Sequence, residues 1–175
     1  MNAAVMEMKK GKELTSQPTF YNLGLMQLAL EEKNRALIDE YVPLVQNAEL
    51  HGNISQSRYI NQVLHSLLDT PEEAGAELRA FLTDPAYDNP MNRSGIAFWA
   101  SYFGEHEIAL QVNKEIFKSG FSLGWLIWRP INKGMRQLPG FKDFVREIGL
   151  VDYWRKSGKW GDFCHPVGDD DFECD

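Results

Sequence analysis

The chain has 175 residues, the length of one ordinary domain, and 43% of them are hydrophobic, which supplies a core and excludes an intrinsically disordered body. No apolar run approaches the roughly 18 residues of a membrane-spanning helix, and the first residues are too short and interrupted to be a secretory signal peptide. The net charge of −7 argues against general nucleic-acid binding.

The chain begins with a polar segment, residues 1–17, which we expect to be flexible. Apolar residues at helical spacing then predict three pairs of helices, at residues 19–31 and 34–47, 56–68 and 71–82, and 93–103 and 105–118. The third of these helices has an inward face of Tyr59, Ile60, Val63, Leu64 and Leu67. Helices of this length cannot bury their apolar faces alone, so each pair needs neighbours.

Turn and capping residues mark the helix ends. Thr70 and Glu73 match a capping box, with Pro71 suited to the first helical position. Gly104 follows Phe103 directly, where a helix commonly ends on a left-handed residue. These signals predict two helices, packed back to back, on either side of Gly104.

A repeat is visible in the small residues of the second helices. Ala36, Ala74 and Ala109 lie at spacings of 38 and 35 residues, which is typical of helical repeats. No segment alternates between apolar and polar residues, so we predict no strand. A helix from Pro139 to Gly149 and a short further helix belong to an aromatic-rich segment, beginning at about residue 122, that we expect to cap the array.

Two sets of residues carry a family resemblance. The first set, Phe20, Leu23, Gly24, Ala36 and Pro43, with Ala97, Gly104 and Ala109 in a later pair, resembles the tetratricopeptide repeat. The second set resembles the C-terminal end of bacterial tetratricopeptide regulators over roughly residues 90–164, through Trp128-Arg129-Pro130, Met135-Arg136, Pro139-Gly140-Phe141-Lys142, Gly149 to Trp154, and Lys159 to Cys164. The resemblance implies an all-α superhelix over residues 18–160 with a helical cap, followed by an acidic tail at 161–175. It also implies a non-catalytic regulatory domain that binds a protein or peptide.

In tetratricopeptide arrays the first helices of the pairs line a concave groove. Carried onto this chain, the resemblance implies groove residues at Tyr21, Arg58, Asn61, His65, Phe98 and Tyr102. Asn61 and His65 lie one turn apart on a single helix face. For the aromatic members, the alternative is simple core packing. Trp99 and Phe103 are expected in the core, on the side away from the groove.

An enzyme is the alternative from another class. Gly120-Phe121-Ser122-Leu123-Gly124 matches the nucleophile elbow of serine hydrolases, and Asp143, Asp152 and His165 follow in the order of that class. The motif needs a strand before Ser122, whereas the sequence predicts a helix there. We therefore expect no catalytic residue, and a hydrolase using Ser122 is kept as the alternative.

Both cysteines lie near the C-terminal end. Cys164 and Cys174 could form a disulfide in an oxidising compartment or remain free thiols. With His165 and Asp169 to Asp171 they could instead bind a metal, but their spacing matches no standard zinc site. We therefore expect no metal and no other cofactor.

The charges are unevenly distributed. Residues 114–161, here called the basic block, carry 10 basic and 4 acidic side chains, whereas residues 162–175 carry 6 acidic and no Lys or Arg side chains. Aromatic and cationic residues of the block could stack bases or hold an anionic partner: Trp125, Trp128, Arg129, Lys133 and Arg136. A simpler interpretation places the tryptophans in the core and the cations in solvent. A third hypothesis is that the acidic tail folds onto the basic block.

These observations lead to one expectation for partner and location. We expect a protein or peptide partner, no nucleic acid and no membrane span. A cytoplasmic location is expected, with a periplasmic one as the alternative if the sequence belongs to a membrane-anchored regulator. The oligomeric state and the identity of the partner are left open.

Overall fold

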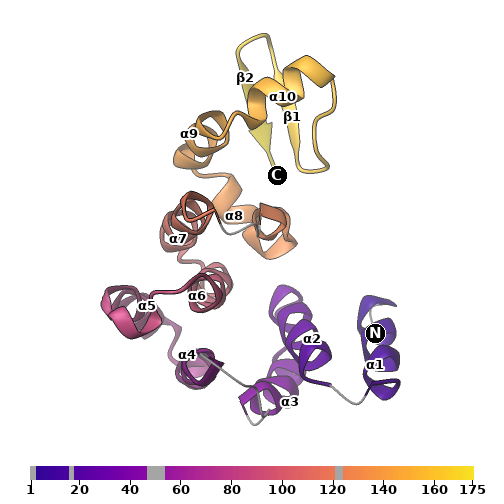
Figure 1. The fold of residues 1–175 in the computed structure, drawn as a ribbon, viewed down its shortest axis with the longest axis vertical. Coiled ribbons are helices and arrows are strands. Elements are labelled where there is room, and N and C mark those ends of the chain that lie inside the picture. The colour runs from indigo at the N-terminus through magenta and orange to yellow at the C-terminus, as the bar shows by residue number, and fades with distance from the viewer. Residues whose placement is uncertain (1–2, 16–17, 47–53, 121–123) are drawn as a thin grey trace. The chain divides into compact units, whose positions relative to one another are not determined.

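The computed structural model describes residues 3–15, 18–46, 54–120 and 124–175. These residues are predominantly helical (Figure 1), in line with the predicted all-α class. They form two compact units. We call Met1–Gly95 the N-terminal unit and Ile96–Asp175 the C-terminal unit. A single body over residues 18–160 was predicted, whereas the observed division falls inside a helix.

The described part of the N-terminal unit contains five helices and the start of a sixth, which continues into the C-terminal unit. They are α1 (Ala3–Glu13), α2 (Thr19–Glu31), α3 (Arg35–Gln46), α4 (Ile54–Ser66), α5 (Ala74–Thr83) and α6 (Pro90–Phe103). Short 3-10 helices lie between them: η1 (Leu67–Asp69), η2 (Pro71–Glu73) and η3 (Pro85–Tyr87). Helices α2 to α6 lie close to their predicted bounds, so these predictions are confirmed.

Helix α1 was not predicted. Residues 1–17 were expected to be flexible, and this was wrong for the residues of α1. Met8 of α1 packs against Gly24 of α2, and Tyr21 of α2 packs against Gly11 of α1. Each glycine leaves room for a side chain of the other helix, so α1 is held by a tertiary contact that the local apolar pattern does not reveal.

The turn between α2 and α3 depends on two polar residues. Lys33 has a φ of +49°, a left-handed conformation that ends α2. Asn34 then begins α3, and its Oδ1 accepts a hydrogen bond of 3.3 Å from the N–H of Leu37. This short turn brings α2 and α3 together, and the two helices pack against each other.

Within the N-terminal unit, the main contacts among the described residues join helices that are adjacent in sequence. Helix α1 packs on α2, α2 on α3, α3 on α4 and α4 on α5. Each of these helices therefore packs chiefly on its neighbours in the sequence. The largest buried side chains of this unit are Leu25, Leu30, Ile38, Tyr41, Ile60, Leu64, Leu78 and Phe81.

The predicted capping box at the start of α5 was wrong. Thr70 makes no side-chain hydrogen bond to the helix. The N–H of Glu73 bonds instead to the main-chain oxygen of Thr70 at 3.1 Å, which makes η2 a 3-10 turn. Helix α5 therefore begins only at Ala74, which is fully buried.

The C-terminal unit begins within α6. Its other described elements are α7 (His106–Lys118), η4 (Gly124–Trp128), η5 (Pro130–Asn132), α8 (Lys133–Arg136), α9 (Pro139–Glu147), α10 (Leu150–Ser157), β1 (Cys164–Val167) and β2 (Asp171–Cys174). Gly104, with a φ of +83°, separates α6 from α7 as predicted. Gly149, with a φ of +75°, lies between α9 and α10.

The two strands form an antiparallel hairpin, so the prediction that the chain contains no strand was wrong. Cys164 pairs with Cys174 at the open end, and Val167 pairs with Asp171 next to the turn. Gly168 has a φ of +60° in that turn. Each strand has only four residues, and in β1 the three residues after buried Cys164 are all exposed, so the sequence shows no alternation long enough to predict the hairpin.

The core of the C-terminal unit combines α6 and α7 with the segment that was predicted to be a cap. Helices α8 and α9 both pack on α7, and α10 packs on α9. The buried side chains of this core include Trp99, Ile108, Val112, Met135, Phe141, Phe144, Val145, Trp154 and Phe172. Across the described residues of both units, no helix is long and apolar enough to cross a membrane.

Candidate functional site

Helix α4 carries three of the predicted groove residues, Arg58, Asn61 and His65. Asn61 is only 5% exposed, so it lies inside the unit and not on a groove surface. Arg58 is partly exposed, but its Nε is buried and has no hydrogen-bond partner among the described residues. His65 is partly exposed as well. Of the three, therefore, only Arg58 and His65 reach the surface.

His65 belongs to a charged network that joins α3, α4 and η1. Its Nε2 lies 2.8 Å from Oδ1 of Asp39. Arg35 donates through Nε to both carboxylate oxygens of Asp39, at 3.0 and 2.9 Å, and through Nη1 and Nη2 to Asp69, at 2.7 and 3.2 Å. Partial burial acts to raise the pKa of Asp39, but hydrogen bonds from His65 and Arg35 outweigh it and lower that pKa. The network holds neighbouring elements together, and His65 is already engaged in it.

The other three predicted groove residues are also in contact within their own units. Tyr21 packs against α1. Phe98 is 6% exposed, with the Arg129 guanidinium carbon 5.6 Å from its ring centre, so the prediction of Phe98 as a groove residue was wrong. Residues 96–100 are all buried, so the helix has no open side there. Tyr102 is partly exposed and meets two aromatic neighbours of α6 edge to face.

An aromatic cluster lies instead on α4, α5 and η3. The rings of Tyr59 and Tyr87 are stacked, with centroids 6.4 Å apart and an interplanar angle of 21°. Phe81 meets both edge to face, at 6.1 and 4.9 Å. Phe81 is 4% exposed, whereas Tyr59 is 51% exposed and Tyr87 is partly exposed. A buried phenylalanine thus supports two tyrosines that present ring surface to solvent.

Two carboxylates, those of Asp84 and Glu77, lie near enough to this cluster to act on Tyr87. Asp84 begins η3 by accepting a 2.9 Å hydrogen bond from the N–H of Ala86, and Glu77 precedes Phe81 by one turn of α5. Burial raises the pKa of Tyr87, and the negative charges of Asp84 and Glu77 raise it further. Neither carboxylate forms an ion pair with any described residue.

We call Tyr59, Glu77, Phe81, Asp84 and Tyr87 together the acidic-aromatic surface. The sequence pattern did not reveal this surface, because it placed Tyr59 on the inward face of a helix and Tyr87 between two predicted helices. The available signal was composition. Residues 69–88 contain six acidic side chains and one arginine.

The hairpin is attached to α9 and α10 through Asp171. Its carboxylate oxygens lie 2.8 Å from Nζ of Lys142 and 2.9 Å from Nη2 of Arg146, and its main-chain oxygen accepts a 3.1 Å bond from Arg155. The hydrogen bond from Lys142, followed by one from the N–H of Phe172, lowers the pKa of Asp171 to about 2. Phe172 is fully buried, with the Lys142 and Arg146 cations 5.5 and 5.2 Å from its ring centre.

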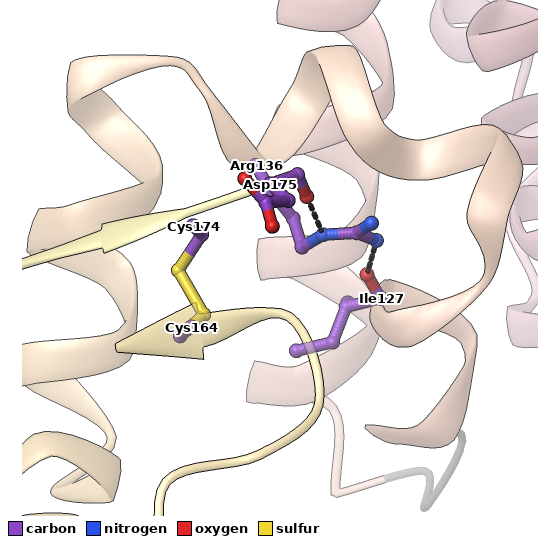
Figure 2. The surroundings of a disulfide bond; sticks show 5 residues. All are labelled: Ile127, Arg136, Cys164, Cys174 and Asp175. Atoms are coloured by element: carbon purple, nitrogen blue, oxygen red, sulfur yellow. Dashed lines mark hydrogen bonds between the residues drawn. A yellow bond between two sulfur atoms is a disulfide. The ribbon is translucent and has the colours of Figure 1, made fainter.

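Arg136 forms a second attachment beside the disulfide (Figure 2). The side chain is 2% exposed, and it donates from Nε to the main-chain oxygen of Asp175 at 2.8 Å and from Nη1 to that of Ile127 at 3.0 Å. Burial lowers the pKa of Arg136, and the charge of Asp175 partly offsets this effect. The Cys164–Cys174 disulfide joins β1 and β2 at the same end of the hairpin.

These contacts confirm the hypothesis that the acidic end of the chain folds onto the basic block. The contacting cations, Lys142, Arg146, Arg155 and Arg136, all belong to the block. Their donors are directed at the hairpin, so this part of the block is occupied by the chain itself. An anion or nucleic-acid site elsewhere on the block stays a prediction.

Ser122 lies outside the described residues. Helix α7 precedes it and η4 follows it, so the described chain supplies no strand ahead of the motif. Asp143, Asp152 and His165 are exposed on α9, α10 and β1. Cys164 and Cys174, which were considered as ligands of an alternative metal site, are joined in the disulfide. The described residues contain no group of three His, Cys, Asp or Glu side chains that could hold a metal ion.

Comparison with protein-family models, with characterised proteins and with solved structures finds no match to this chain. The tetratricopeptide resemblance therefore rests on the residues given above, and the repeat architecture stays a prediction.

Proposed function

We propose that the protein is a non-catalytic interaction domain that binds a protein or peptide partner through the acidic-aromatic surface. The observation that carries this proposal is the stacked Tyr59–Tyr87 pair, which exposes ring surface above buried Phe81. Exposed aromatic side chains on a packed support, with a polar rim, are typical of binding hot spots. The rings need little ordering on binding because the pair and its support already pack against each other.

The scaffold around this surface supports the same proposal. In the N-terminal unit, helices adjacent in sequence pack on each other, as expected for a helical-repeat array. The resemblance to tetratricopeptide regulators leads us to propose that this array is of that kind and that the domain is regulatory. Such arrays present extended surfaces to peptide segments.

The disulfide bears on where the protein works. Disulfides persist in oxidising compartments and are rare where thiols are kept reduced. The Cys164–Cys174 bond therefore supports an oxidising location, such as the periplasmic alternative, for the proposed interaction domain.

Selection from a displayed random-peptide library on the intact, oxidised chain tests the proposal. The variant Tyr59→Ser removes the most exposed ring of the surface. Tyr153→Ser is the matched control, because Tyr153 is an exposed tyrosine, 60% accessible, on α10. Enriched peptides should bind the wild type and the Tyr153→Ser variant but not Tyr59→Ser. The proposal fails if no enriched peptide depends on Tyr59.

A further inference from the structure

We propose that the acidic-aromatic surface recognises an arginine side chain, so that the partner is a protein segment with an exposed arginine. This inference rests on the proposed function and specifies the chemistry of its partner. It combines two independent features of the surface, the solvent-exposed tyrosine side chains and the two carboxylates without an ion-pair partner in the described part of the chain.

The ring geometry suits a flat cation. Tyr59 and Tyr87 are nearly parallel, at 21°, and Tyr59 is 51% exposed. A guanidinium group is planar and weakly hydrated, so it stacks on a tyrosine face more readily than an ammonium group does. Phe81 meets both rings edge to face, which holds them in place before a ligand arrives.

The carboxylates give the surface its charge preference. Asp84 is fixed by its hydrogen bond to the N–H of Ala86, and Glu77 lies one helical turn before Phe81. Nearby Asp88 is neutralised by Arg93 at 2.9 Å, but Glu77 and Asp84 have no such partner among the described residues. A guanidinium group on the tyrosine face could therefore donate to a carboxylate while it stacks.

Other occupants fit less well. An apolar partner would take two carboxylates out of water without giving them a cation, which is unfavourable. A second copy of the chain is a poor source of arginine from its basic block, because Arg136, Arg146 and Arg155 are bound to the hairpin and Arg129 lies over Phe98. An arginine from a different protein would supply the missing cation and does not depend on the arginines that the basic block already uses.

Nuclear magnetic resonance titration of the intact, oxidised chain tests the inference. The probe is a short capped glycine–serine peptide with one central arginine. Its matched control replaces arginine by citrulline, which has the same shape without the charge, and a lysine version compares the two cations. Ring signals of Tyr59 and Tyr87 are assigned with the variants Tyr59→Phe and Tyr87→Phe. The arginine peptide should shift both ring signals. It should bind about 2- to 5-fold more tightly than the citrulline peptide, which is the range expected for an exposed cation–π contact.

Charge variants separate the carboxylates from the rings. Glu77→Gln combined with Asp84→Asn keeps the side-chain shapes and should weaken arginine-peptide binding by about 2- to 5-fold, with a smaller salt dependence. Glu107→Gln, at an exposed position on α7, makes one of the same charge changes in the other unit and should leave binding unchanged. Equal binding of the arginine and citrulline peptides, or wild-type affinity of the double variant, would overturn the inference.

The two proposals fail in different ways. If selected peptides need Tyr59 but neither contain arginine nor respond to the charge variants, arginine recognition is wrong and the interaction domain stands. If the arginine peptide shifts both tyrosines but no selected peptide depends on Tyr59, the surface binds the cation and the proposed function is wrong.

Discussion

The Cys164–Cys174 disulfide makes the sharpest stability prediction. Replacing both cysteines by serine removes a cross-link between residues 10 positions apart. The chain-entropy relation for a loop of this size gives a loss of about 2.7 kcal/mol in the free energy of unfolding. The loss should fall on the C-terminal unit, because the hairpin packs there through Phe172, against Trp154 and Trp160 at 5.9 and 6.1 Å.

Urea unfolding followed by tryptophan fluorescence measures this loss. All five tryptophans lie beyond residue 98, so the signal reports the C-terminal unit alone even if the two units unfold separately. With an ordinary urea dependence of about 1–3 kcal/mol per molar, the midpoint should fall by roughly 1–3 M in the double variant. Reductant added to the wild type should produce a similar shift.

The double serine variant supplies its own control, because reductant should not move its midpoint. A wild type that released two free thiols on reduction and kept its midpoint would refute this prediction. Such a result would mean that the packing of Phe172 and the contacts of Asp171 hold the hairpin without the cross-link. The disulfide would then contribute nothing to stability.

Three further predictions concern the hairpin and the helix ends. Deleting residues 165–175 should expose the α9 cations as a salt-sensitive anion-binding surface, and a fluorescent polyphosphate that bound no better than to the intact chain would contradict this. The folded-state pKa of Asp171 is lowered to about 2, so its stabilising contribution is present above the unfolded pKa of about 3.9 and is lost as the pH falls from there toward 2. Acid titration should therefore show a loss of folding stability in this pH window, and the variant Asp171→Asn should lack it. Gly104→Ala should destabilise the protein by about 1 kcal/mol, because residue 104 has a φ of +83°. Gly95→Ala should stabilise it by roughly 0.5–1 kcal/mol, because residue 95 lies inside α6 and the added carbon has no atom within 4 Å. Circular dichroism during urea unfolding measures both changes, and equal effects would contradict the assigned conformations.

The predictions that succeeded rest on local chemistry. Pro139 and Gly149 lie at the two ends of α9, because proline suits the first helical turn and glycine readily adopts the left-handed conformation that follows the helix. The acidic end of the chain reaches the basic block through Asp171, as opposite charges close together in sequence suggest. In both cases the deciding interaction spans few residues or follows from net charge.

The predictions that failed concern which side of an element is covered. Phe98 was assigned to a groove and Tyr59 to a core, and the structure reverses both, with 6% and 51% exposure. Helical spacing shows that one face is apolar, but it does not show what packs against the opposite face. Helix α1 and the hairpin were missed for a related reason. Neither is held by an apolar stripe: contacts between glycines and side chains hold α1, and a disulfide closes the hairpin.

The amino-acid sequence by itself determined the helical class, the positions of α2 to α7 and α9, and the end of α6 before Gly104. These features depend on spacing and backbone preference within a few residues. Only the tertiary structure decided that Tyr59, Phe81 and Tyr87 meet, that two carboxylates beside them lack cations, and that the disulfide-closed hairpin occupies part of the basic block. Those features depend on which elements pack together, and a contact between residues far apart in the chain leaves little trace in either one's local sequence.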